Sequence, residues 1–178
     1  VFCAGADLKE IETIDFHSDD GPLGFTHLHV HKPTIAAIAG YAVAGGLEVA
    51  CWCDLRIVDE TAIFGCFERR FGVPLIDGGT QRLPRIVGLG RALDMILTGR
   101  PVGAEEAKQI GLATQVVPKG LHLDHAIELA HQLGRFPQIC MNNDRDAVYG
   151  GLGVSIERGL QIERELGQET IYSGEAYA

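Results

Sequence analysis

The sequence has 178 residues, of which 46% are hydrophobic and 22% are charged, and its 15 basic and 24 acidic side chains give a net charge of −9. This composition is typical of a folded globular protein, and the negative charge disfavours nucleic acid or an anionic membrane as the main partner. No apolar run approaches the ~18 residues of a membrane span, and no basic segment followed by an apolar one indicates a signal peptide.

The first predicted elements surround a turn made of small residues. Residues 1–3 are typical of the end of a strand, and because the chain starts with Val1 and not Met, we expect further strands before it. Residues 4–7 suit a turn before a short helix. A loop-like stretch of mixed polarity follows, and residues 34–39 then predict a short buried strand that ends at Gly40.

A second turn of small residues joins this strand to a helix predicted over residues 46–53. Gly45 and Gly46 let a ligand approach the main chain, and the N–H groups at a helix start can hold an anionic oxygen. Glu48 places a carboxylate in the first turn of the same helix. The sequence therefore predicts a reactive site at this turn, and the alternative is a tight turn in which glycine serves only close packing.

Strands and helices continue to alternate through the middle of the chain. The predicted strands cover residues 55–58, 63–65 and 113–117, and the predicted helices lie near Glu68 and over residues 78–85 and 105–110. Another helix carries on one face the apolar residues Leu89, Leu93, Ile96 and Leu97. A helix that ends at Gly134 carries on one face Leu123, Ile127 and Ala130, and a charged helix follows Gly150.

This order of elements predicts an α/β fold. Its core covers residues 1–120, and a helical C-terminal extension over residues 121–178 belongs to the same functional domain.

Six sequence blocks, in this order, resemble the enoyl-CoA hydratase/isomerase superfamily, which is also called the crotonase superfamily. The blocks are residues 3–10, 32–42, 45–50, 53–54 with 64–65, 78–83, and 97–99 with 104–107. The resemblance implies a crotonase-like spiral core of ββα turns that lacks its first strands here, and helices that build a homotrimer or a dimer of trimers. It also implies an acyl-CoA thioester as ligand and no separate cofactor, because coenzyme A is part of the substrate.

The resemblance assigns roles to individual residues. In the family two main-chain N–H groups form an oxyanion hole, and the resemblance implies that Ala6 and Gly45 supply them, because a thioester carbonyl that becomes an enolate needs donors where its charge grows. The two carboxylates of the hydratases fall on Glu48 and Glu68, which would act jointly as acid and base. The implied substrate-binding residues are Ala4, Ala6, Asp7, Leu8, Lys9 and Gly45.

Some residues depart from the family pattern. The departures are Ala44 for a common glycine, Cys66 and Phe67 for a polar residue and proline, and Arg69 and Arg70 for an apolar pair. Asp77 stands where the family usually has a small residue, and it adds a third carboxylate as a further candidate acid. The alternative is that Asp77 is a loop or helix-capping aspartate.

The histidines and cysteines predict neither a metal site nor a disulfide framework. His27, His29 and His31 would share one face of a strand, but the resemblance implies a helix there, in which this spacing splits the set, so we expect no metal. The five cysteines are an odd number without paired Cys-x-x-Cys spacing, which favours a reducing compartment such as the cytoplasm.

Three functions remain open from the sequence. The leading hypothesis is an enoyl-CoA hydratase that adds water across the 2,3 double bond of an acyl-CoA thioester. The second is an enoyl-CoA isomerase, in which one carboxylate, either Glu68 or Asp77, moves a proton along the acyl chain. The third is a non-catalytic acyl-CoA-binding module, since a fold alone does not fix a function.

Overall fold

The computed structural model describes residues 1–177, and the contacts within it divide the chain into two compact units. The first unit comprises Val1–His29 and Thr34–Ile127, and the second comprises Val30–Pro33 and the chain from Glu128 onward. The boundary falls inside helix α5 (His122–Leu133). Every residue that the sequence predicted for the site belongs to the first unit.

Two three-stranded sheets make up the β structure of the first unit. One sheet is entirely parallel and has the order β1 (Ile35–Ile38), β3 (Leu55–Asp59), β6 (Gln115–Val117). In the other sheet, β4 (Ile63–Gly65) pairs in parallel with β2 (Tyr41–Val43) and antiparallel with β5 (Val102–Gly103). Only Ala39 and Gly40 separate β1 from β2, and the positive φ of Gly40 (64°) lets the chain turn from one sheet into the other.

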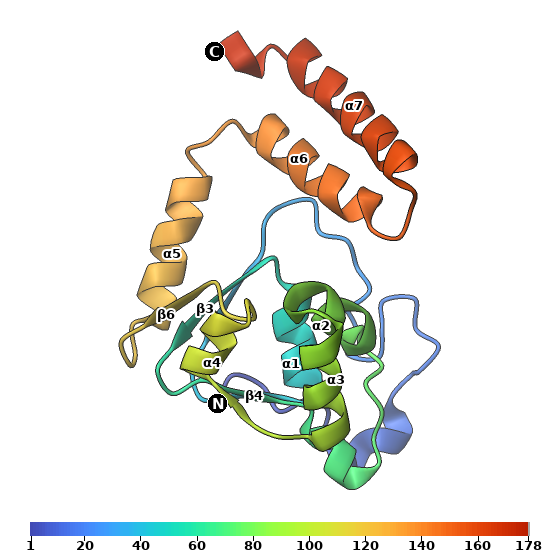
Figure 1. Cartoon of the computed structure of the whole chain (residues 1–178), viewed down its shortest axis with the longest axis vertical. Coiled ribbons are helices and arrows are strands. Elements are labelled where there is room, and N and C mark those ends of the chain that lie inside the picture. The colour runs from blue at the N-terminus through green and yellow to red at the C-terminus, as the bar shows by residue number, and fades with distance from the viewer. Residues whose placement is uncertain (178) are drawn as a thin grey trace. The chain divides into compact units, whose positions relative to one another are not determined.

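Helices follow the strands, as Figure 1 shows. In the first unit these are α1 (Gly45–Trp52), α2 (Gly79–Val87), α3 (Leu89–Thr98) and α4 (Ala104–Gln109), together with the 3-10 helices η1 (Leu8–Thr13) and η2 (Phe67–Phe71). The second unit contains α6 (Gln138–Gly151), α7 (Ile156–Tyr172) and the 3-10 helix η3 (Glu175–Tyr177).

The core of the first unit forms where α1, α2 and α3 meet the strands. Helix α1 packs against α2, and α2 packs against α3. The largest side chains of this core are fully buried and come from five elements: Ile38, Leu47, Phe64, Leu83 and Met95. Burial of this apolar surface fixes α1, and with it the turn that precedes α1, in one position.

The mixed α/β architecture with helices at its C-terminal end is confirmed. The strands predicted over residues 34–39, 55–58 and 63–65 and the helix predicted over 46–53 correspond closely to β1, β3, β4 and α1. Strands β2 and β5 and helix α6 were not predicted from the sequence, because two of them are only two or three residues long and the third has no strong apolar face.

Residues 1–3, expected to be the end of a strand, pair with β2: Cys3 and Ala42 form a parallel bridge, and the N–H of Val43 donates to the carbonyl oxygen of Cys3 (3.1 Å). Another local expectation is wrong. Residues 14–33 contain neither helix nor strand, so the helix expected at the histidines is absent from this described stretch. Gly21 and Gly24 have φ values of 90° and 83°, which interrupt any regular element there.

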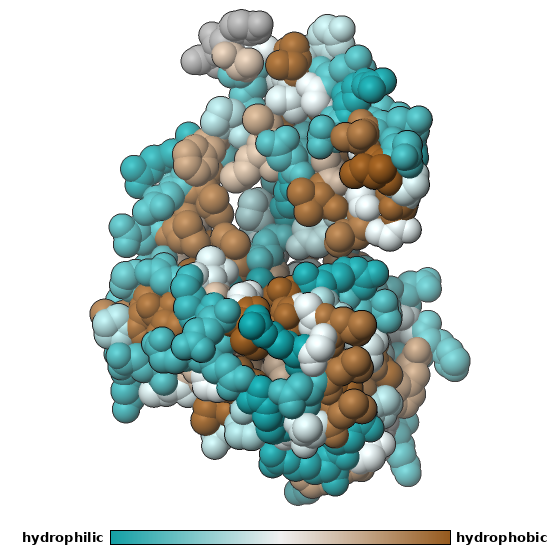
Figure 2. Space-filling model, viewed as in Figure 1, coloured by the Kyte–Doolittle hydropathy of each residue, from teal (hydrophilic) through white to brown (hydrophobic). Residues whose placement is uncertain are grey.

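Most of the apolar face predicted for α3 points outward. Leu89, Leu93 and Leu97 are exposed, and hydrophobic residues gather over α3 in Figure 2. Ile96, the fourth residue predicted for this face, is half-buried against the core. The buried residues of α3 are the smaller Ala92 and the flexible Met95. Apolar periodicity therefore identified the helix correctly without indicating which face meets the core.

The second unit is built around one pair of helices. The side-chain amide of Asn143 on α6 donates hydrogen bonds to the carbonyl oxygen of Leu166 (3.1 Å) and to Oγ1 of Thr170 (3.0 Å) on α7. Helix α7 begins after Ser155, whose hydroxyl accepts a hydrogen bond from the N–H of Arg158. Across residues 1–177, no helix has the length and apolar character needed to span a bilayer.

Candidate active site

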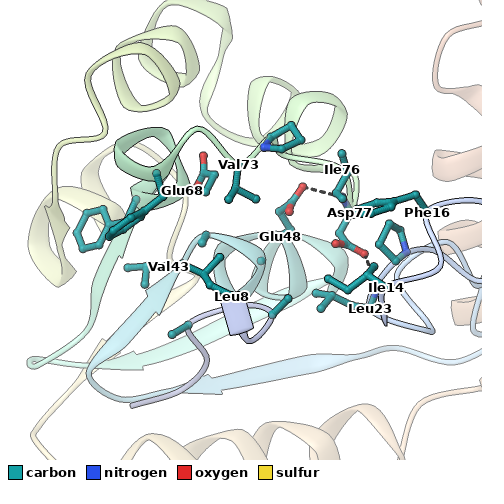
Figure 3. Close-up of a pocket in the computed structure, with 18 residues that line it drawn as sticks. Leu8, Ile14, Phe16, Leu23, Val43, Glu48, Glu68, Val73, Ile76 and Asp77 are labelled. Atoms are coloured by element: carbon teal, nitrogen blue, oxygen red, sulfur yellow. Dashed lines mark hydrogen bonds between the residues drawn. The ribbon is translucent and has the colours of Figure 1, made fainter. Parts of the chain in front are cut away.

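A cavity of about 250 Å³ opens in the first unit, and Figure 3 shows the side chains that line it. Most of its wall is apolar and is formed by Leu8, Ile14, Phe16, Pro22, Leu23, Val43, Phe67, Phe71, Val73, Pro74 and Ile76. The small residues Ala4, Ala6, Ala44 and Gly45 complete the wall at the two turns. Its ionisable side chains are three carboxylic acids: Glu48, Glu68 and Asp77. The cavity therefore combines an apolar binding surface with acids that can move protons.

The two small-residue turns are in direct main-chain contact. A methyl group added at Gly5 would lie 2.8 Å from the nitrogen of Gly45, and one added at Gly45 would lie 3.0 Å from the Cα of Gly5. At Gly46 the contact is tighter still, because an added methyl group would lie 2.0 Å from the carbonyl oxygen of Cys3. The distances at Gly5 and Gly46 leave no room for a Cβ, and the contact at Gly45 is tight, so the glycines serve a close approach of two chain segments.

This approach places two unused N–H groups at the cavity wall. Ala6 and Gly45 both line the cavity, and a methyl group at Gly45 would lie 3.9 Å from the nitrogen of Ala6. Within residues 1–177, neither N–H donates a hydrogen bond to another group of the chain. The Gly45 N–H also lies at the start of α1, where the helix dipole favours negative charge. The pair is suited to holding an anionic oxygen.

Ala44, directly before α1, has an unusual backbone conformation. Its φ of 52° makes it the only residue other than glycine with a positive φ in the described chain. Its N–H donates to the carbonyl oxygen of Gly65 (2.9 Å), and its own carbonyl oxygen accepts from the N–H of Leu47 (2.9 Å). These bonds hold a strained conformation at the start of the helix that carries Glu48.

Glu48 projects from the first turn of α1 and is 2% exposed. Its Oε1 accepts hydrogen bonds from the N–H groups of Asp77 (2.9 Å) and Gly79 (2.8 Å). The pKa of Glu48 is raised to about 7, chiefly by burial. The two N–H donors act in the opposite direction because they favour the charged form, and the nearby acids Asp77 and Glu68 add to the increase. Glu48 can therefore gain or lose a proton near neutral pH.

Glu68 lies in η2 and is also buried. Neither of its carboxylate oxygens has a hydrogen-bond partner among the described residues. Burial raises the pKa of Glu68 above its ordinary value, while its own N–H and Arg69 act in the opposite direction. A buried carboxyl group without a hydrogen-bond partner destabilises the fold, and Glu68 at the cavity wall is therefore a candidate functional residue.

Asp77 is the third acid and lies on the other side of Glu48 from Glu68, as Figure 3 shows. Its Oδ1 accepts hydrogen bonds from the N–H of Leu23 (2.9 Å) and the hydroxyl of Thr26 (2.5 Å). Helix α2 begins after Gly78 and has no side-chain cap, so Asp77 does not cap this helix. It belongs to the loop that precedes α2.

The structure brings most of the predicted substrate-binding residues to the cavity. Ala4, Ala6, Leu8 and Gly45 lie in its wall. Asp7 and Lys9 do not line it; they are exposed, and the carboxylate of Asp7 accepts a hydrogen bond from the N–H of Lys9 (2.9 Å). Their role in binding stays a prediction.

Sequence reasoning missed the wall formed by the irregular stretch before β1. Ile14, Phe16 and Leu23 lie in a stretch of mixed polarity, and they line the cavity. No periodicity in this stretch indicated where they lie.

Two cysteines near the site remain thiols. Cys51 on α1 and Cys66 before η2 are buried, and burial raises the pKa of each thiol to about 12. A thiolate nucleophile is therefore disfavoured at both positions.

Known proteins resemble the chain along almost its whole length. A profile of the family described as enoyl-CoA hydratase/isomerase matches residues 1–176. A Rhizobium meliloti (strain 1021) protein named as a probable enoyl-CoA hydratase is 41% identical over 173 residues, which cover 94% of this chain and 66% of that protein. The chain thus spans about two thirds of the length of this relative.

Solved structures share the fold. An enoyl-CoA hydratase of Mycobacterium marinum has a TM-score of 0.92 at 30% identity, covering 98% of this chain and 70% of that chain. A Thermobifida fusca protein, named as a candidate enoyl-CoA hydratase and solved in complex with CoA, has a TM-score of 0.74 at 30% identity, covering 81% of this chain and 56% of that chain. The predicted crotonase-like fold is confirmed.

Proposed function

Because the chain belongs to the enoyl-CoA hydratase/isomerase family, we propose that the protein adds water across the 2,3 double bond of an acyl-CoA thioester. The observation that carries this proposal is the cavity in which two unused N–H groups and two buried acids, Glu48 and Glu68, lie together. Coenzyme A enters as part of the substrate, and no separate cofactor is required.

The N–H groups of Ala6 and Gly45 would hold the thioester oxygen. As water attacks the β-carbon, the electrons of the double bond move toward this oxygen and form an enolate. Donors that are fixed before the reaction stabilise this charge without reorganising, and loss of one such donor typically costs on the order of 10²–10³ in rate.

Glu48 and Glu68 would share the proton transfers. One carboxylate takes a proton from water while the water oxygen forms its bond to the β-carbon. The other, protonated carboxyl group then gives its proton to the α-carbon as the enolate collapses, so the pair ends with as many protons as it began. Their raised pKa values support this division, because one of two neighbouring buried acids can remain protonated near neutral pH.

The test is turnover of crotonyl-CoA by the full-length protein, followed as loss of the conjugated absorbance. We expect Glu48→Gln and Glu68→Gln each to lower kcat by roughly 10²–10⁴ while acyl-CoA binding is largely kept. A double variant with both changes that retains full activity would remove the hydratase proposal.

Isomerisation is a second candidate because Asp77 adds a third acid to the same cavity. In that reaction a single acid would move a proton from one end of a three-carbon unit to the other through the same enolate. A 3-enoyl-CoA substrate that gains conjugated absorbance, with no turnover of crotonyl-CoA, would favour the isomerase.

A non-catalytic acyl-CoA-binding module draws less support. The unpaired, buried Glu68 destabilises the fold, and simple binding of a neutral acyl chain gives no reason to keep it. Unchanged rates in every assay after Glu48→Gln would favour this alternative.

Two further proposals concern the oligomeric state and the cellular compartment. The exposed leucines of α3 support burial of this face in a homotrimer or a dimer of trimers, because apolar side chains of this size are more stable when covered. The five free cysteines support a reducing compartment, and we propose the cytoplasm. Light scattering of the full-length protein and fractionation of cells test the two statements.

A further inference from the structure

Three hydrogen bonds meet at Asp77 and join two parts of the cavity. Its carboxylate oxygen Oδ1 accepts from the N–H of Leu23 and from the hydroxyl of Thr26, which lies 51 residues away in the sequence. Its own N–H donates to Oε1 of Glu48 at 2.9 Å. One residue therefore holds both an apolar wall of the cavity and one of its acids.

Arg82 on α2 also bonds to both chain segments that meet at Asp77, and we call this meeting point the junction. Its Nη1 donates to the carbonyl oxygen of Asp77 (2.8 Å), and its Nη2 donates to the carbonyl oxygen of Thr26 (2.6 Å). The planar guanidinium fork spans two chain segments in one fixed geometry. Asp77 and Thr26 are thus joined twice, once through their side chains and once through this arginine.

Two glycines beside the junction have no room for a side chain in the observed arrangement. A methyl group at Gly78 would lie 2.2 Å from Nη1 of Arg82, and one at Gly21 would lie 2.4 Å from the hydroxyl of Thr26. Both glycines also have positive φ values, 94° and 90°. Substitution of either glycine would therefore displace Arg82 or Thr26.

We use the term wall segment for residues 21–26, which contain Pro22 and Leu23 of the cavity lining. The wall segment has no helix or strand to fix its position. Its polar links to the rest of the site are the bonds to Asp77 and Arg82. The ring of Phe25 also packs edge-on against Trp52 of α1, with ring centroids 5.3 Å apart. A ligand that displaces Leu23 would also displace the main-chain N–H that donates to Asp77.

We propose that Asp77 is a positioning residue that couples the wall segment to Glu48, so that contact of an acyl chain with Leu23 sets the orientation of the Glu48 carboxyl group. This inference rests on the proposed function. In it Asp77 neither gives nor takes a proton during turnover. It fixes the N–H that orients Glu48, and the hydroxyl of Thr26 fixes Asp77.

Two acids act on the pKa of Glu48, namely Asp77 from the loop before α2 and Glu68 from η2. Glu48 in turn acts on the thiols of Cys51 on α1 and Cys66 before η2. Thr26→Val removes none of these groups and deletes only the hydroxyl that donates to Asp77. A shift in the pH profile of this variant would therefore report a change in the hydrogen bond to Glu48.

The experiment compares Thr26→Val with Thr26→Ser and with Thr61→Val in the full-length protein. Thr61 is the matched control, because its hydroxyl makes the same kind of bond, at 2.5 Å, to Oδ1 of the buried Asp59 outside the cavity. We expect Thr26→Val to lower kcat roughly tenfold, as expected for loss of one hydrogen bond to a charged group. The limb of its kcat profile that reports Glu48 should move to higher pH, since weaker N–H donation disfavours the charged form.

Thr26→Ser should show the wild-type pH profile of kcat. Thr61→Val should have a lower free energy of unfolding and an unchanged pH profile. A Thr26→Val variant with the wild-type profile and kcat would overturn the inference, as would a Thr26→Ser variant that is equally impaired.

A second variant separates positioning from acid catalysis. Asp77→Asn keeps an oxygen that can accept from Leu23 and Thr26, so we expect it to retain kcat within about tenfold of wild type. Loss of turnover comparable to that of Glu48→Gln would show that Asp77 is itself a catalytic acid and would overturn the inference. Full activity of Glu48→Gln would instead contradict the proposed function. The two failures are distinguishable because Asp77→Asn tests the inference and Glu48→Gln tests the proposed function.

Discussion

The N–H of Gly79 donates a 2.8 Å hydrogen bond to Oε1 of Glu48, across 31 positions of the chain. A methyl group at Gly79 would lie 2.8 Å from the same oxygen. We therefore expect Gly79→Ala to displace the Glu48 carboxyl group and to lower kcat by about 10²-fold, because small displacements of a reacting group have effects of this size. Turnover of crotonyl-CoA measures the effect.

The control for this variant is Gly90→Ala, in the first turn of α3, where an added methyl group meets nothing within 4 Å. It should keep full activity and raise the free energy of unfolding by about 0.5–1 kcal/mol, as alanine favours a helix over glycine. Equal activity in the two variants would contradict the assigned role of the Gly79 contact.

Glu68→Gln should separate activity from stability. The substitution removes an acid from the cavity and replaces an unpaired buried carboxyl group by a neutral amide. We expect kcat to fall by roughly 10²–10⁴, with a free energy of unfolding at neutral pH that is unchanged or higher. Denaturant unfolding beside the turnover assay checks both, and a large loss of stability would show that Glu68 has a structural role instead.

Ala44→Gly should stabilise the protein. The φ of 52° at Ala44 is unfavourable for any residue with a Cβ, and glycine adopts it without strain. We expect the free energy of unfolding to rise by about 1 kcal/mol, after allowance for the greater freedom of glycine in the unfolded chain. As a comparison, Ala42→Gly in buried β2 should lower it, and urea titration distinguishes the two signs.

Stability should fall as pH rises through the range in which Glu48 loses its proton. The pKa of Glu48 is raised from 4.5 to about 7, so between these values the folded protein holds a proton that the unfolded chain has released. The free energy of unfolding therefore decreases across this window, by at most about 3 kcal/mol from this group. Burial raises the pKa of Glu68 as well, which adds a change of the same sign.

Urea unfolding near pH 5 and near pH 8 measures this loss. Glu48→Gln should lose less stability between the two conditions than the wild-type protein, because the amide does not titrate. The same pH dependence in the variant and the wild type would show that Glu48 ionises in the folded protein as it does in the unfolded chain.

Local patterns predicted the centre of the site better than its walls. Gly45 and Glu48 lie in one continuous stretch of sequence. The sequence predicted Glu48 in the first turn of the helix and Gly45 in the turn before it, and in the structure Gly45 is the first residue of α1. The contact of this turn with Ala6 depends on two glycines that exclude side chains, and the sequence blocks indicated that meeting as well. Their catalytic roles stay predictions.

The remaining parts of the site depend on contacts between distant segments. Leu23 reaches the cavity through a bond to Asp77, 54 residues later, and nothing near Leu23 in the sequence encodes that partner. Likewise, the spacing of Leu89, Leu93 and Leu97 is the same whether their face meets a core or solvent. Tertiary packing determines which of these side chains are buried, and the packing partners of a residue cannot be identified from a single sequence.

The meeting of the two turns at Gly46 and Cys3 has a consequence for how new activities can arise on this scaffold. In the proposed function, the donors to the substrate oxygen are the N–H groups of Ala6 and Gly45, which belong to the peptide backbone, so exchanging side chains elsewhere in the cavity would leave them in place. On that proposal, a library that varies positions 48, 68 and 77 while retaining the glycines would preserve the capacity to stabilise an enolate. Each member would differ only in where protons are delivered, and one scaffold could supply several reactions that begin from the same intermediate.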